Sequence, residues 1–159
     1  MGKVFSIAEL TAQRQRWKEE KKTVVFTNGV FDLLHRGHVK YLAEAKKLGD
    51  VLIVGMNTDD SVHRIKGPLR PIVPGDDRAF VLSQLASVDA VCLFTEETPF
   101  NLIAAVVPDI LVKGGDYTLD AIVGKDIVEH AGGKVMTIPF VENKSTTNIV
   151  EIIRQRFCS

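Results

Sequence analysis

The chain has 159 residues, 45% of them hydrophobic and 25% charged, and its formal net charge is zero. This balance is typical of one compact domain with a buried core, and it argues against a disordered chain. A neutral chain whose basic residues are interleaved with acidic ones does not attract nucleic acid or a membrane surface as a whole. An anion-binding site must therefore be built locally.

The sequence carries no recognisable targeting or membrane signal. The N-terminus lacks the apolar core of a signal peptide, and no apolar run approaches the roughly 20 residues that span a bilayer. The two cysteines, Cys92 and Cys158, have neither metal-ligand spacing nor the pattern of a disulfide framework. We expect a cytoplasmic protein that has no nucleic-acid or membrane partner.

The first 22 residues have the pattern of a charged amphipathic helix. Ile7, Leu10, Arg14 and Trp17 recur at helical spacing. We expect residues 1–22 to form an N-terminal helical extension outside the main domain, which spans residues 23–159.

Strands and helices are expected to alternate through the main domain. Short β-branched and aromatic runs predict five strands, at Thr23–Thr27, Val51–Met56, Ala90–Phe94, Asp109–Lys113 and Lys134–Ile138. Helical spacing and capping residues predict helices from about His38 to Lys46, after Thr58 or Asp59, from Asp76 or Asp77 to Leu85, after Thr98-Pro99, from Asp120 to His130, and from Ser145 to Ile153. The stretch Lys66–Gly75 holds three prolines and two glycines and is expected to be a long functional loop.

This alternation predicts an α/β fold, a Rossmann-like doubly wound and mainly parallel five-stranded sheet with helices on both faces. Such sheets bind ligands beyond the carboxyl ends of their strands, where the strand order reverses. The candidate site segments follow the five strands and are Asn28–His38, Asn57–Asp59, Phe94–Glu97, Lys113–Asp116 and Pro139–Thr147.

Two histidines flank Arg36-Gly37 directly after the first strand of the main domain. Imidazole nitrogens donate hydrogen bonds, Gly37 lets a phosphate approach the backbone, and a helix that begins near His38 points its N–H groups at the same place. His35 and His38 therefore suit a phosphate clamp, although a surface pair and half of a metal site remain open on these residues alone. A metal site needs further ligands, and His63 and His130 lack ligand spacing, so we expect none.

The run Thr27-Asn28-Gly29-Val30-Phe31-Asp32-Leu33-Leu34-His35-Arg36-Gly37-His38 resembles the signature of the cytidylyltransferase-like nucleotidyltransferases, the HxGH superfamily. Lys144-Ser145-Thr146-Thr147 is similar to the superfamily's second motif. The resemblance extends from Thr23 to Ile153, so the main domain is expected to be a nucleotidyltransferase domain.

Within the superfamily, two segments resemble the nucleotidyltransferase part of the ADP-heptose synthases. They are Leu111–Tyr117 and Ser145–Ile149. In many bacteria that part follows a sugar kinase, and this chain resembles the free-standing form. The resemblance implies that ATP and D-glycero-β-D-manno-heptose 1-phosphate give ADP-heptose and pyrophosphate, by direct in-line attack without a covalent enzyme intermediate.

One departure from the superfamily bears on the nucleotide. Cytidylyltransferases carry an Arg-Thr pair shortly before the Ser-Thr-Thr, and the aligned positions here are Phe140 and Val141. The departure favours ATP over CTP, and Lys144 is a candidate replacement for the missing charge.

The resemblance also implies roles for individual residues. The candidate catalytic residues are His35, His38 and Lys66, with Lys66 acting as a mobile cation or else being a solvated loop lysine. The candidate nucleotide-binding residues are Thr27, Asn28, Gly29, Phe31, Asp32, His35, His38, Arg78, Lys113, Gly115, Asp116, Ser145, Thr146 and Thr147. Arg78 is expected to reach a phosphate, with a surface arginine as the alternative. Asp32 is expected to orient a histidine or a magnesium-bound water.

Mg²⁺ is expected as the companion of ATP, because triphosphates bind as magnesium complexes. Two alternatives stay open, namely a transferase acting on another phosphate such as glycerol 3-phosphate or phosphopantetheine, and a nucleotide-binding module without catalysis. ATP and a sugar 1-phosphate are the expected partners, and a homodimer is expected because related proteins often form dimers.

Overall fold

The computed structural model describes residues 1–115, 118–139 and 145–157. Within these residues the strands are β1 (Lys3–Phe5), β2 (Val24–Gly29), β3 (Val51–Asn57), β4 (Ala90–Phe94), β5 (Ile110–Gly114) and β6 (Lys134–Ile138). The helices are α1 (Ile7–Glu19), α2 (Arg36–Lys46), α3 (Asp59–Lys66), α4 (Gly75–Ser83), α5 (Phe100–Val106), the short 3₁₀ helix η1 (Leu119–Ala121), α6 (Lys125–His130) and α7 (Thr146–Phe157).

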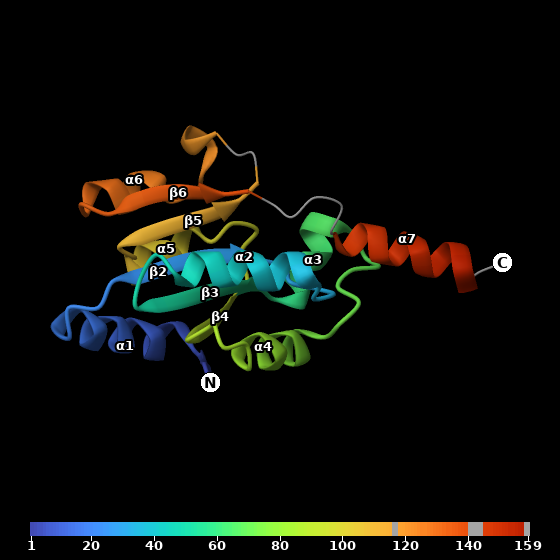
Figure 1. The fold of residues 1–159 in the computed structure, drawn as a ribbon, viewed down its shortest axis with the longest axis horizontal. Coiled ribbons are helices and arrows are strands. Elements are labelled where there is room, and N and C mark those ends of the chain that lie inside the picture. The colour runs from blue at the N-terminus through green and yellow to red at the C-terminus, as the bar shows by residue number, and fades with distance from the viewer. Residues whose placement is uncertain (116–117, 140–144, 158–159) are drawn as a thin grey trace.

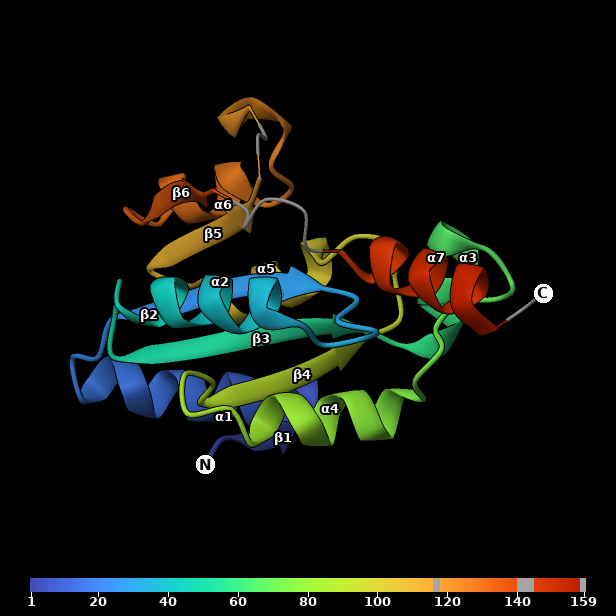
Figure 2. The same cartoon turned by 45° about the vertical axis from the view of Figure 1, so that its right-hand side comes forward.

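The six described strands form one sheet in the order β1-β4-β3-β2-β5-β6, and every neighbouring pair is parallel (Figures 1 and 2). Strand β3 lies inside this sheet, and all seven of its residues are buried. A parallel strand covered on both faces has to be apolar throughout rather than alternating. The predicted doubly wound, parallel α/β fold is confirmed.

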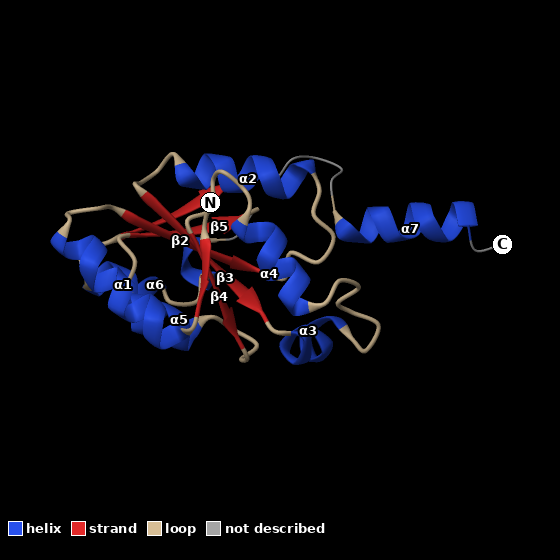
Figure 3. Ribbon diagram, turned by 90° about the horizontal axis from the view of Figure 1, so that it is seen from below, coloured by secondary structure: helices blue, strands red, loops and turns tan. Residues whose placement is uncertain are grey.

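Helices cover both faces of the sheet, as Figure 3 shows in the view from below. On one face α1, α5 and α6 bury Leu10, Ile103 and Val128 against a cluster that includes Phe26 of β2. On the other face α2 and α4 bury side chains such as Leu42 and Leu82 against the opposite side chains of β2 and β3. Because helices cover both faces of the sheet, a ligand would reach it at the carboxyl ends of the strands.

The sheet has one strand more than the sequence predicted, because β1 pairs with β4 at the edge. Three residues are too few to show the two-residue alternation by which a strand is recognised. The expected extension, residues 1–22, thus adds a strand to the same sheet as residues 23–159. It also adds Leu10 and Trp17 of α1 to the core, at 0% and 8% exposure.

The helix expected from Asp120 to His130 is wrong as a single element. The structure has η1 and α6 there, separated at Gly124, whose φ of +86° lies outside the right-handed helical region. A Cβ on Gly124 would lie 2.7 Å from Ile103 Cδ1, so the close approach to α5 also needs glycine.

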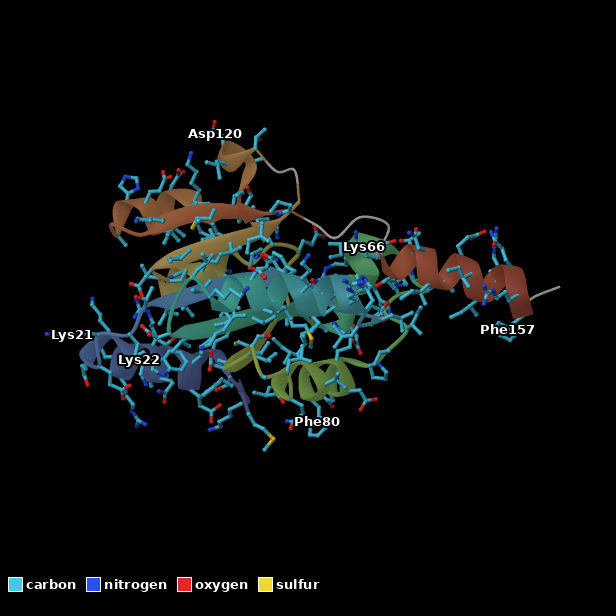
Figure 4. All side chains as sticks on the ribbon, in the orientation of Figure 1. Lys21, Lys22, Lys66, Phe80, Asp120 and Phe157 are labelled. Carbon is cyan, nitrogen blue, oxygen red and sulfur yellow. The ribbon has the colours of Figure 1, made fainter. Side chains whose placement is uncertain are left out.

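Two other boundaries differ from expectation near the carboxyl edge. Helix α2 begins at Arg36, two residues before His38, and α3 continues to Lys66, which the sequence placed in the loop. Helix α7 begins near the N-terminus of α2 and projects away from the body, and it has no buried residue (Figures 1 and 3). Phe157, labelled near its end in Figure 4, is 78% exposed. No helix among the described residues combines the length and apolarity that crossing a membrane requires.

Candidate active site

A cleft of about 750 Å³ opens at the carboxyl ends of β2, β3 and β5. Strand β2 has β3 on one side and β5 on the other, so the strand order reverses between β2 and β5. That reversal is where doubly wound sheets bind ligands. The cleft is lined by Asn28, Gly29, Val30, Phe31, Asp32, His35, Gly37, His38, Tyr41, Asn57, Ile65, Lys66, Arg70, Glu97, Lys113, Gly114, Ser145, Thr146, Thr147 and Asn148.

The two histidines sit at the N-terminus of α2. His35 is its N-cap residue, and His35 Nδ1 accepts a hydrogen bond of 3.1 Å from the backbone N–H of Gly37. His38 is in the first turn, and its ring stacks on that of His35 with centroids 3.9 Å apart. Because His35 Nδ1 is an acceptor, the neutral ring of His35 carries its proton on Nε2. The N-terminus of α2 and the Nε2–H donor of His35 are therefore close together.

His38 is held as a neutral ring. Burial, with a smaller effect from the charge of His35, lowers the pKa of His38 from 6.5 to about 4. Its Nδ1 is the one buried side-chain nitrogen or oxygen among the described residues that has no hydrogen-bond partner. A proton on Nδ1 would be buried without an acceptor, which favours the tautomer that carries it on Nε2. His38 is therefore a neutral Nε2–H donor at pH 7.

The ring of Phe31 packs against the ring of His38. Its ring meets His38 edge-on, with centroids 5.3 Å apart, and its backbone is left-handed, with a φ of +49°. A Cβ on Gly29 would lie 3.0 Å from the Phe31 ring, so the missing side chain of Gly29 gives that ring its place. Gly29 and Phe31 thus shape the site and line the cleft, and their contact with the nucleotide stays a prediction.

Lys113 and Asn28 meet across the strand reversal. Lys113 Nζ, at the end of β5, donates a 2.9 Å hydrogen bond to Asn28 Oδ1, near the end of β2. Burial lowers the pKa of Lys113. Both line the cleft, as the sequence predicted, together with Gly114. The predicted Gly115 donates its N–H to the carbonyl of Ile138 and is not among the cleft-lining residues. Asp116 lies outside the described residues.

Thr27 is placed differently from the expectation of a nucleotide contact. It is 0% exposed, and its hydroxyl lies 2.6 Å from the hydroxyl of Tyr41, which itself donates to the carbonyl of Val112. Burial raises the pKa of Tyr41 to about 12, so the phenol stays protonated. Thr27 therefore links β2, α2 and β5 beneath the cleft, because strand alternation turns its side chain into the core.

Asp32 is hydrogen-bonded to the loop before α4 and not, as one expectation had it, to a histidine. Its carboxylate accepts hydrogen bonds from the backbone N–H groups of Ile72 and Val73 and from Arg70 Nε. Burial opposes ionisation of Asp32, but these three donors outweigh it and keep its pKa below the usual 3.8. Asp32 thus fixes the glycine- and proline-rich loop against the cleft, and it brings Arg70 to the rim.

Arg78 is also placed differently from the expectation of a phosphate ligand. It is 2% exposed and is not among the cleft-lining residues. Its guanidinium donates to the backbone carbonyls of Val73, Val30 and Asn57 and to Asp59 Oδ1. The guanidinium of Arg78 is thus directed at protein acceptors and not at the cleft.

The remaining candidates come from α3 and from the start of α7. Lys66 is exposed at the end of α3 and faces the cleft. Ser145 accepts a 3.1 Å hydrogen bond from the backbone N–H of Asn148, which makes it the predicted cap of α7. Thr146 donates to the carbonyl of Leu33 at 3.4 Å, which links α7 to the loop between β2 and α2. Thr147 lines the cleft with them.

Four residues that line the cleft were not predicted as site residues and lie outside the predicted strand-end segments, namely Tyr41, Ile65, Arg70 and Asn148. Tyr41 lies three residues after His38 on α2, and this spacing puts both on one helix face. Arg70 is a cation in the loop already singled out, so its charge was a usable signal. Asn148 lies within the Ser145–Ile149 segment that carried the resemblance, but it was given no role of its own.

The described residues hold no group of three or more histidine, cysteine or acidic side chains placed to bind a metal ion. The cations Lys66, Arg70 and Lys113 line the same cleft as the histidine pair. Together with the N-terminus of α2, they form a site that suits a polyanion.

Comparison with known proteins identifies the family. A family model described as cytidylyltransferase-like matches residues 26–155. The chain is 55% identical over 148 residues to the bifunctional protein HldE of Trichlorobacter lovleyi and 56% identical over 136 residues to that of Syntrophotalea carbinolica. These matches cover 93% and 86% of this chain but 29% and 28% of the relatives, so the chain spans under a third of their length.

Solved structures agree with this family. The lipopolysaccharide core biosynthesis protein from Thermoplasma volcanium superposes with a TM-score of 0.62 at 33% identity, covering 77% of this chain and 99% of that one. Pantothenate synthetase from Thermus thermophilus shares the fold, with a TM-score of 0.63 at 18% identity over 94% of this chain and 67% of that one. The chain belongs to the cytidylyltransferase-like family of nucleotidyltransferases.

Proposed function

We propose that the chain transfers the adenylyl group of ATP to D-glycero-β-D-manno-heptose 1-phosphate. A phosphate oxygen of the sugar phosphate attacks the α-phosphorus of ATP. A new P–O bond forms, the bond between the α-phosphorus and the bridging oxygen breaks, and pyrophosphate leaves. The products are ADP-heptose and pyrophosphate, with no covalent enzyme intermediate.

The stacked histidine pair is the observation that carries this proposal. Two Nε2–H donors at a helix N-terminus suit the charge that develops on the α-phosphate and the leaving pyrophosphate. Preorganised donors of this kind account for much of the catalysis in such transfers. The cations Lys66, Arg70 and Lys113 line the same cleft and would hold the triphosphate.

Heptose as the acceptor is supported by similarity to the HldE proteins and by the lipopolysaccharide core biosynthesis protein. ATP is favoured over CTP by Phe140 and Val141, which stand where cytidylyltransferases have an Arg-Thr pair. These two positions and Lys144 lie outside the described residues, so the preference for ATP rests on sequence.

Mg²⁺ would enter as the companion of ATP, held mainly by the phosphates, as is usual for this ion. Asp32 is a poor candidate ligand, because its oxygens already accept bonds from Ile72, Val73 and Arg70. The ion would neutralise charge on the triphosphate. The cytoplasmic location and the homodimer stay predictions, and sedimentation of the purified chain would test the latter.

A substrate screen tests the proposal. Pyrophosphate release is measured with ATP or CTP against heptose 1-phosphate, glycerol 3-phosphate and phosphopantetheine. We expect release only with ATP and heptose 1-phosphate. Turnover only with CTP would overturn the adenylyl assignment, and nucleotide binding without turnover on any acceptor would indicate a non-catalytic module.

A further inference from the structure

Arg78 is a buried hub that joins three segments at the edge of the cleft. Its side chain is 0% exposed. Nη1 donates to the Val30 carbonyl at 2.6 Å, Nε to the Val73 carbonyl at 2.9 Å, and Nη2 to the Asn57 carbonyl at 3.1 Å. Nη2 also donates to Asp59 Oδ1. The loop after β2, the end of β3 and the loop before α4 thus converge on one guanidinium.

This placement goes against the local helix. Arg78 lies in the first turn of α4, where a cation opposes the helix dipole. A buried charge persists only when its donors are satisfied, and the fork of arginine can meet several acceptors in fixed directions. The contacts to Val30, Val73, Asn57 and Asp59 compensate both the unfavourable helix dipole and the burial of the charge.

The contact with Val30 leads directly to the histidines. Val30 precedes Phe31, whose backbone is left-handed with a φ of +49°. The Phe31 ring meets His38, and the His38 ring stacks on His35. A shift of the Val30 carbonyl would therefore move the ring on which the histidine pair rests.

Val73 is also hydrogen-bonded to Asp32 in the segment after β2. The backbone N–H of Val73 donates to Asp32 while its carbonyl accepts from Arg78. Residues 30–32 and 70–73 are therefore linked twice, once through the Asp32 carboxylate and once through the Arg78 guanidinium. Arg78 also donates to β3 and to α3.

We infer that Arg78 is a positioning residue for the proposed transfer. It does not touch the nucleotide, and it fixes the backbone at Val30 and Phe31 so that His38 and His35 face the cleft in their working positions. This inference rests on the proposed function for its kinetic consequence, and its structural consequence is independent of turnover.

Arg14 offers a matched control at the opposite end of the sheet. It is also a largely buried arginine, 11% exposed, that pairs with an aspartate, Asp109, and donates to a loop carbonyl, that of Val107. Lysine at either position keeps the charge and removes the fork. Both substitutions should lower stability, but only Arg78→Lys should disturb the histidines.

The kinetic test compares these two variants with ATP and the sugar phosphate. We expect Arg78→Lys to lower kcat at least about tenfold while KM for ATP changes less than about threefold, because displaced donors lose transition-state contacts. Arg14→Lys should keep both constants. A large rise in KM for ATP would identify Arg78 as a phosphate ligand and overturn the inference. Equal kinetics in the two variants would reduce Arg78 to a structural role and overturn it as well.

Imidazole NMR of the protein without substrate supplies the independent arm. Arg78→Lys should shift the ring signals of His35 and His38 and leave those of His63 and His130 in place, and Arg14→Lys should shift none of the four. If Arg78→Lys does not fold, Asp59→Asn keeps the arginine and an oxygen acceptor, and should shift the same two signals by less. Unmoved His35 and His38 signals would contradict the inference, even if the wild-type chain turned over no substrate and the proposed function itself failed.

Discussion

The imidazole rings of His35 and His38 lie stacked, with centroids 3.9 Å apart and planes inclined by 20°. Two rings this close cannot both carry a proton charge without strong repulsion. At least one ring of the pair is therefore neutral, and burial makes His38 that ring. The cations that line the cleft are Lys66, Arg70 and Lys113, and Arg70 forms an ion pair with Asp32.

Removing the His38 ring should slow the transfer without abolishing nucleotide binding. His38→Ala should lower kcat about 10²–10³-fold, the loss usual for one preorganised donor to a developing oxyanion. Steady-state pyrophosphate release measures it. His130→Ala, an exposed histidine at the end of α6, is the control and should keep wild-type turnover. Near-normal turnover in His38→Ala would remove the histidine pair from the mechanism.

The depressed pKa of His38 predicts a loss of stability in mild acid. Because this pKa is about 4 in the folded chain and 6.5 for an unperturbed histidine, the unfolded state binds more protons between those pH values. The contribution of His38 is therefore present above pH 6.5 and is lost as the pH falls towards about 4. Urea unfolding at several pH values measures this, and His38→Gln should flatten the slope in that window. An unchanged slope in the variant would show that His38 titrates normally.

Thr27 should matter for stability and not for nucleotide affinity. Thr27→Val keeps the shape and removes the hydrogen bond to Tyr41, which should cost about 1 kcal/mol of unfolding free energy. KM for ATP should stay within about twofold, because the side chain lies beneath the cleft. The pairing is checked by a double-mutant cycle with Tyr41→Phe, in which the two losses should not add. A marked rise in KM would restore the nucleotide contact that the sequence had suggested.

Lys113 should contribute directly to triphosphate binding. Lys113→Met removes a half-buried cation from the cleft and leaves Asn28 without its donor. KM for ATP should therefore rise at least about tenfold, as expected for a lost charge-assisted hydrogen bond. Lys47→Met is the control, since Lys47 is 68% exposed and pairs only with Glu44 among the ion pairs of the described residues. Equal KM values for the two variants would exclude Lys113 from nucleotide binding.

The sequence was sufficient where a pattern was local and long enough to repeat. The five strands of the main domain, the parallel sheet and the cap at Ser145 all follow from runs of apolar residues and from capping chemistry, and the structure confirms them. The histidine pair at the start of α2 also follows from local spacing. Strand β1 did not, because three residues carry no period.

The site residues show a different limit. Asn28 and Lys113 are 85 positions apart, and the sequence could place both only at the same edge of the sheet, not in one hydrogen bond. Arg78 and Thr27 have residue types that suit ligand binding, but their side chains turn inward. Whether a polar side chain faces the cleft or the core depends on tertiary packing, which a motif does not encode.

Product analysis under competition tests the central claim most directly. The purified chain is given ATP and CTP together at equal concentration, with D-glycero-β-D-manno-heptose 1-phosphate, and the sugar nucleotide is identified by mass spectrometry. We expect ADP-heptose, with one pyrophosphate released for each molecule formed. CDP-heptose as the main product, or no sugar nucleotide from an otherwise folded and ATP-binding protein, would contradict the proposed transfer.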